Sequence, residues 1–141
     1  MENKPVPPEN KKTVLVVDSN VLVRQLLVEV LAHGDGYNVL MAGTGEQGLQ
    51  RSREFQGEIH LLVTDFQMAG MSGIELATAM TVDRPKLKVL MMSGFPEGML
   101  VLNEGWHFLP KPFVASQMRT LVSGLLTPDK KSRYAAPVST E

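Results

Sequence analysis

The chain has 141 residues, of which 43% are hydrophobic, and a formal net charge of −1. This length predicts one domain, and the near-zero charge gives no overall field that would attract nucleic acid or an anionic membrane. The absence of cysteine excludes disulfides, thiolate metal sites and a cysteine nucleophile. No apolar run approaches the roughly 20 residues of a membrane span, so we expect no membrane insertion and a cytoplasmic location.

Five short apolar runs alternate with helical patterns along the chain. The expected strands cover residues 13–17, 37–41, 60–65, 87–92 and 106–109. The expected helices cover residues 21–32, 44–55, 73–82 and 114–126, with a short fourth segment of about two turns at 96–102. Alternating strands and helices predict an α/β fold of the flavodoxin-like, doubly wound kind. We expect its five-stranded parallel sheet to have the order 2-1-3-4-5 with helices on both faces, and its fourth helix to be short.

The helical spacing predicts which side chains face the core. In the first helix we expect one apolar stripe of Leu22, Leu26 and Val30, with Leu27 and Leu31 beside it. In the last helix we expect one apolar face, made of Val114, Met118, Leu121, Val122 and Leu125.

The two ends of the chain differ in composition from its middle. Residues 1–12 contain three prolines and no apolar core, which predicts a flexible leader and not a signal peptide. Residues 128–141 are polar and are expected to be a disordered tail. The folded domain is therefore predicted to span residues 13–127.

Four polar side chains stand at or just beyond the ends of predicted strands, namely Asp18, Asp65, Ser93 and Lys111. Parallel strands end at one edge of a sheet, so these residues should converge there. Two carboxylates can hold a hard divalent cation, and a carboxylate can attack phosphorus to become an aspartyl phosphate. A hydroxyl and an ammonium group could then bind the phosphoryl oxygens. Each residue alone could be a cap, a turn or a surface group, but the four together indicate phosphoryl transfer.

Four motifs in this order carry a resemblance to a known family. They are Val-Val-Asp at 16–18, Thr-Asp-Phe-Gln-Met-Ala-Gly-Met-Ser-Gly at 64–73, Met-Ser-Gly at 92–94 and Leu-Pro-Lys-Pro-Phe at 109–113. With them, the chain from about Thr13 to Leu126 resembles the response-regulator receiver domains of two-component signalling, in the CheY-like superfamily. Such a domain is a signalling module and not an enzyme in the usual sense, because it catalyses at most its own phosphorylation and dephosphorylation.

The resemblance implies a role for each site residue. Asp65 would be the phosphoacceptor, and Mg²⁺ would be held by Asp18, Asp65 and the backbone carbonyl of Gln67. Ser93 would be the switch hydroxyl and Phe108 the switch aromatic. Lys111 would contact the phosphoryl group, and the Lys111–Pro112 peptide bond is expected to be cis.

Two departures from the family pattern stand out. The family has two adjacent acids after the first strand, whereas the second position here is Ser19. We therefore expect weaker Mg²⁺ binding and slow or absent autophosphorylation, although the hydroxyl of Ser19 or a water could fill the coordination site. The segment between Ser93 and Lys111 is about one helical turn shorter than usual in the family. We expect a fourth helix that is short or replaced by a loop, an altered partner surface, and a monomer or weak dimer.

Three functions are compatible with these residues. In the first, a histidine kinase or a phosphotransfer protein donates a phosphoryl group to Asp65, and a switched surface is read by a downstream protein that the sequence does not identify. In the second, favoured by Ser19, the domain is a pseudo-receiver that binds proteins without phosphorylation. The third is a small-molecule enzyme or flavoprotein, which the residues after the first strand and Gln67 do not favour. The sequence leaves open whether the receiver stands alone or belongs to a longer hybrid kinase.

Overall fold

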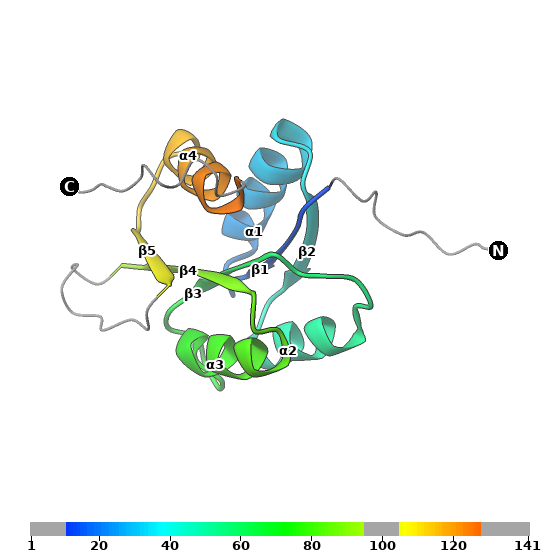
Figure 1. Cartoon of the computed structure of the whole chain (residues 1–141). Coiled ribbons are helices and arrows are strands. Elements are labelled where there is room, and N and C mark those ends of the chain that lie inside the picture. Colours follow the sequence, from blue (N-terminus) through cyan, green and yellow to red (C-terminus); the bar gives the residue numbers. More distant parts are fainter. Residues whose placement is uncertain (1–10, 95–104, 128–141) are drawn as a thin grey trace.

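The protein folds around one parallel sheet (Figure 1). The structure, a computed structural model, describes residues 11–94 and 105–127. Its strands are β1 (Thr13–Val17), β2 (Asn38–Ala42), β3 (Leu61–Asp65), β4 (Lys88–Ser93) and β5 (Trp106–Pro110). Its helices are α1 (Val21–Val28), the π-helical segment η1 (Glu29–Gly34), α2 (Gly45–Glu54), α3 (Gly73–Asp83) and α4 (Ala115–Leu126). The strand order is β2-β1-β3-β4-β5 and every pairing is parallel, which confirms the predicted topology.

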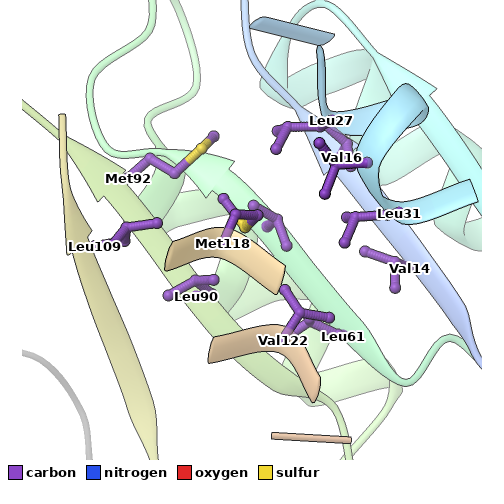
Figure 2. Packing of buried hydrophobic residues seen from close by; sticks show 12 residues of the cluster. Val14, Val16, Leu27, Leu31, Leu61, Leu90, Met92, Leu109, Met118 and Val122 are labelled. Carbon is purple, nitrogen blue, oxygen red and sulfur yellow. The ribbon is translucent and has the colours of Figure 1, made fainter. Parts of the chain in front are cut away.

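Helices cover both faces of the sheet, with α1 and α4 on one side and α2 and α3 on the other (Figure 1). All five residues of β1 are buried, as expected for a central strand covered on both faces. Alternate side chains of β1 enter two separate cores. Val14 and Val16 join the core beneath α1 and α4, where Figure 2 shows them with Leu27, Leu31 and Met118. The other core, beneath α2 and α3, contains Leu15 and Val17 of β1 and the buried side chains of α3.

Short polar contacts fix where the helices begin. The side chain of Asn20 accepts a hydrogen bond from the N–H of Leu22 at 2.8 Å and caps α1. Ser72 and Glu75 form a reciprocal capping box at the start of α3. At α2, Thr44 caps the helix, but the side chain of Gln47 reaches back to Gly43 and not to Thr44. The starts of α1, α2 and α3, all of which follow strand ends, are thereby defined.

The predicted apolar stripe of the first helix was wrong at Leu22 and Leu26, and correct at Val30. Leu22 is 69% exposed and Leu26 is 40% exposed, while Leu27, Val30 and Leu31 are buried against the sheet. The face of the helix that packs on the sheet is therefore centred on Leu27 and Leu31. It is rotated by about 100° from the predicted stripe, which corresponds to one residue along the chain. The expected single α-helix also changes to π-helical hydrogen bonding at Glu29, which shifts the phase of its last turn.

The expected face of the last helix is correct except at its first residue. Met118 and Val122 are buried, and Leu121 and Leu125 are partly buried against the same core. Val114 is 60% exposed because it precedes the helix as its N-cap residue and does not continue the helical row.

Several predictions concern residues outside the part that the structure describes. These are the leader up to residue 10, the short fourth helical segment at 96–102, and the tail at 128–141. Within residues 11–94 and 105–127, no helix has both the length and the apolar character needed to cross a membrane.

Candidate functional site

The four polar residues picked out by their positions come together at one edge of the sheet. Asp65 is the last residue of β3 and Ser93 the last of β4, while Asp18 and Lys111 each directly follow a strand. In the sheet register, Asp65 lies beside Met92 and Ser93 beside Pro110. Because β1, β3, β4 and β5 are parallel, their carboxyl ends place all four residues at the same rim.

The ammonium group of Lys111 lies between the two carboxylates. Its Nζ is 2.9 Å from Oδ2 of Asp18 and 3.5 Å from Oδ2 of Asp65. The Asp18 side chain is 1% exposed, that of Asp65 17% and that of Lys111 25%. The peptide bond between Lys111 and Pro112 is cis, as the resemblance implied. The Lys111 ammonium group therefore pairs with both carboxylates. The site is open to solvent at Asp65 and Lys111, whereas Asp18 is buried.

Asp18 also holds the turn between β1 and α1. Its Oδ1 accepts a hydrogen bond from the N–H of Asn20 at 2.8 Å, while its Oδ2 faces Lys111. The Nη1 group of Arg24, from α1, donates to the Asp18 carbonyl oxygen at 2.6 Å. Both carboxylate oxygens of this buried residue are thus satisfied, as a buried charge requires.

Burial raises the pKa of the Asp65 carboxyl group, and the negative charge of Asp18 raises it further. The positive charge of Lys111 and hydrogen bonds from Lys111 and from the backbone of Phe66 act in the opposite direction. The net effect is a raised pKa, so Asp65 is a carboxylate that its surroundings stabilise less than water would.

The loop after Asp65 is built so that it can pass close to the strand end. The N–H of Phe66 donates to the carbonyl of Met92 at 2.8 Å, and the N–H of Gly73 donates to the carbonyl of Phe66 at 3.0 Å. A Cβ atom on Gly73 would lie 2.2 Å from the carbonyl oxygen of Asp65, so only glycine fits there. The loop leaves Gln67 exposed at the rim.

The oxygen donors at this rim fit a magnesium ion. Asp18 and Asp65 supply two carboxylates at this rim, and Gln67 follows in the exposed part of the loop. Mg²⁺ could be held by these carboxylates and the Gln67 carbonyl, because it keeps several waters. Ser19 is exposed and adds no carboxylate. Within residues 11–94 and 105–127, no group of three or more histidine, cysteine or acidic side chains could hold a metal. The donor set is therefore one acid poorer than a three-carboxylate site.

The two residues expected to act as a switch lie on neighbouring strands. Ser93 is 3% exposed, and its carbonyl oxygen accepts a hydrogen bond from the N–H of Lys111 at 2.7 Å. Phe108 is partly buried on β5, beside Met91 of β4, and packs against the core beneath α2 and α3. Ser93 is thus joined to the Lys111 segment, while Phe108 lies on the face that α3 covers.

Sequence reasoning missed two residues that support this rim, Arg24 and Glu46. Arg24 bonds the Asp18 carbonyl, and Glu46 accepts a hydrogen bond from the N–H of Met71 at 3.0 Å. A usable signal did exist. Arg24 and Glu46 fall in the first turns of α1 and α2, and helices that follow strands begin at the rim where the site lies.

Comparison with known proteins gives the family. The model of the response regulator receiver domain matches residues 14–123. The chain belongs to this family. The receiver is 33% identical to the sensor kinase CckA of Brucella abortus over 118 residues, which are 81% of this chain and 12% of that protein. It is 36% identical to the response regulator GacA of Pseudomonas syringae pv. syringae over 81 residues, which are 57% of this chain and 37% of that protein.

A solved structure shows the same likeness in three dimensions. The crystal structure of the receiver domain from the hybrid histidine kinase CckA has a TM-score of 0.72 and 30% sequence identity with this chain. The match covers 82% of this chain and 99% of that one. The receiver therefore corresponds to a whole receiver domain, but it spans only about an eighth of the sensor kinase and just over a third of the regulator.

Proposed function

We propose that this receiver accepts a phosphoryl group on Asp65 from a histidine kinase or a phosphotransfer protein, and that it does so in the cytoplasm. The observation that carries the proposal is the position of Lys111, whose Nζ lies within 3.5 Å of carboxylate oxygens of both Asp18 and Asp65. A cation at the rim of a nucleophilic carboxylate is what a transferred phosphoryl group requires to balance its charge. The family relationship to a sensor kinase and to response regulators supports the same partners.

The proposed transfer starts at Asp65. A carboxylate oxygen attacks the phosphorus atom of a phosphohistidine, so a P–O bond forms as the P–N bond breaks and the imidazole leaves. Lys111 then faces the phosphoryl oxygens and donates to them, as it now faces the two carboxylates. Asp18, Asp65 and the Gln67 carbonyl would hold Mg²⁺, which when bound neutralises negative charge on the phosphoryl oxygens.

Phosphorylation is proposed to reach a downstream protein through Ser93 and Phe108. The hydroxyl of Ser93, at the end of β4, would donate a hydrogen bond to a phosphoryl oxygen. Phe108 on the adjacent strand is partly buried, so its packing can change without unfolding the core. A local bond at the rim would thereby alter the surface near β5.

Ser19 favours a second candidate function. It leaves two carboxylates at the rim, and Lys111 already pairs with both of them. Weak metal binding would slow phosphorylation, and the domain would then act as a pseudo-receiver that binds a protein partner through its fold alone.

Intact mass after incubation with acetyl phosphate and Mg²⁺ tests the first function against the second. We expect the wild type to gain one phosphoryl group and Asp65→Asn to gain none. The same comparison with a phosphorylated histidine kinase domain tests protein-to-protein transfer. If the folded wild type gains nothing from either donor and Ser19→Asp gains the group, the pseudo-receiver is the correct function.

A further inference from the structure

The β3–α3 loop, residues 66–72, is hydrogen-bonded at both ends, where the N–H of Phe66 donates to the carbonyl of Met92 and Ser72 shares a capping box with Glu75. Its base is closed by the hydrogen bond from Gly73 to the Phe66 carbonyl, at 3.0 Å. Three of the loop residues, Gln67, Ala69 and Gly70, are exposed. A loop held only at its base would leave the carbonyl of Gln67 free to move, because each free residue has several backbone conformations.

A contact from α2 holds the loop between these ends, at Met71. The Oε2 atom of Glu46, in the first turn of α2, accepts a hydrogen bond from the N–H of Met71 at 3.0 Å. The two residues are 25 positions apart in the sequence. A bond from a backbone N–H to an ionised carboxylate is stronger than one between neutral groups. Glu46 therefore ties the loop to a helix of the scaffold.

Two glycines allow this contact to form. A Cβ atom on Gly45 would lie 2.8 Å from the carbonyl oxygen of Met71 and 2.9 Å from its Cβ, so α2 begins flush against the loop. Gly70 has φ of +77°, and a Cβ atom there would lie 2.8 Å from Oε2 of Glu46. A larger residue at either position would separate Glu46 from the loop. The start of α2, at Gly45 and Glu46, is thus in direct contact with the loop at Gly70 and Met71.

We propose that Glu46 is a positioning residue for the phosphoryl-transfer site. Glu46 touches no reacting atom. It holds the Met71 end of the β3–α3 loop, the Phe66–Gly73 bond holds the base, and the two together set the place of the Gln67 carbonyl between them. The role of that carbonyl as a metal ligand rests on the function proposed above, whereas the hold on the loop does not.

Two variants and a control distinguish the hydrogen bond to Met71 from the negative charge of Glu46. Glu46→Ala removes the acceptor, while Glu46→Gln keeps an acceptor oxygen and loses only the charge. Glu54→Ala is the matched control, because Glu54 is an exposed acid on the same helix whose side chain accepts from Gln50 and not from the loop. Amide hydrogen exchange over residues 66–73 reads the loop directly and needs neither metal nor phosphoryl donor. Mg²⁺ titration of Trp106 fluorescence and thermal unfolding complete the set.

In Glu46→Ala we expect exchange at the Met71 amide to rise about tenfold, the factor that fits a hydrogen bond to a charged group. Exchange in β3 and α3 should not change. The Mg²⁺ dissociation constant should rise by a factor of about three to ten for the same reason. Glu46→Gln should restore most of both properties, and Glu54→Ala should change neither.

Two results would overturn the proposal. One is an unchanged exchange rate at the Met71 amide in Glu46→Ala. The other is a rise in that rate that is not specific to the lost bond, either because Glu46→Gln shows it in full or because exchange also rises throughout β3 and α3. If the wild type binds no Mg²⁺ at all, the metal role of the Gln67 carbonyl fails, and the exchange data alone decide whether Glu46 positions the loop.

Discussion

Replacing Lys111 by methionine should destabilise the protein, because the carboxylates of Asp18 and Asp65 lose the positive charge that pairs with them. Coulomb's law with an effective dielectric constant of about 20 gives roughly 6 kcal/mol for charges 2.9 Å apart and roughly 5 kcal/mol at 3.5 Å. Desolvation of the ions offsets most of this attraction, and water screens the quarter of Lys111 that is exposed. We expect a net loss of about 3 kcal/mol in the free energy of unfolding. Most of it comes from the buried Asp18.

Thermal and urea unfolding of Lys111→Met, Asp18→Asn and the double variant measure this loss. For a domain of this size, about 3 kcal/mol lowers Tm by roughly 6–12 °C. The double variant should be more stable than the sum of the single losses predicts, by about 1–2 kcal/mol, because residues in direct contact are coupled. The loss in Lys111→Met should also shrink in acid, where Asp65, whose pKa is raised, takes up a proton.

An unchanged Tm in Lys111→Met would refute the reasoning. Strict additivity in the cycle would do so as well, because it would show that the ammonium group does not stabilise the Asp18 carboxylate. Lys111→Arg is the matched control, since it keeps the positive charge at the rim and should lose less stability than methionine.

Three further predictions follow from the site and its scaffold. Ser19→Asp should bind Mg²⁺ at least tenfold more tightly than the wild type in a fluorescence titration, since a carboxylate about 4 Å from a divalent cation gains roughly 2 kcal/mol in water. The control Ser19→Asn, which adds no charge, should bind Mg²⁺ no more tightly than the wild type. Asp65→Asn should be more stable than the wild type at pH 7. The pKa of Asp65 is raised on folding, so its charge costs stability above the folded pKa, and the difference should vanish below the unfolded value of 3.8. Arg84→Ala should lose about 2–3 kcal/mol in urea unfolding, with partial recovery in Arg84→Lys, because the guanidinium group donates to oxygens of Ser52, Phe55 and Gly57.

The sequence by itself determined the layers of this protein and the residues at its rim. Apolar runs that end in Asp18, Asp65 and Ser93 indicate buried strands by their short length and apolar composition, and helical spacing between them requires crossovers. Right-handed crossovers make the sheet parallel, and parallel strands end at one edge. Convergence of these residues with Lys111 therefore needed no coordinates. Local caps such as Ser72 with Glu75 were predictable for the same reason, because both partners lie within one helical turn.

Only the tertiary structure decided how each element is turned and which distant groups meet. Leu22 and Leu26 satisfy the helical period as well as Leu27 does, and contact with the sheet chose between two rows about 100° apart. The ammonium group of Lys111 contacts both carboxylates because of how the ends of β1, β3 and β5 are placed relative to one another. No local sequence pattern encodes that placement.

The hydrogen bond from Met71 to Glu46 shows the same limit. It joins residues 25 positions apart, at the start of a helix and in a loop whose shape depends on Gly70. Periodicity and capping are set by neighbours within a few residues of each other, so a sequence displays them. Long-range hydrogen bonds depend on where whole helices and strands settle when the two cores pack, and that arrangement exists only in the folded chain.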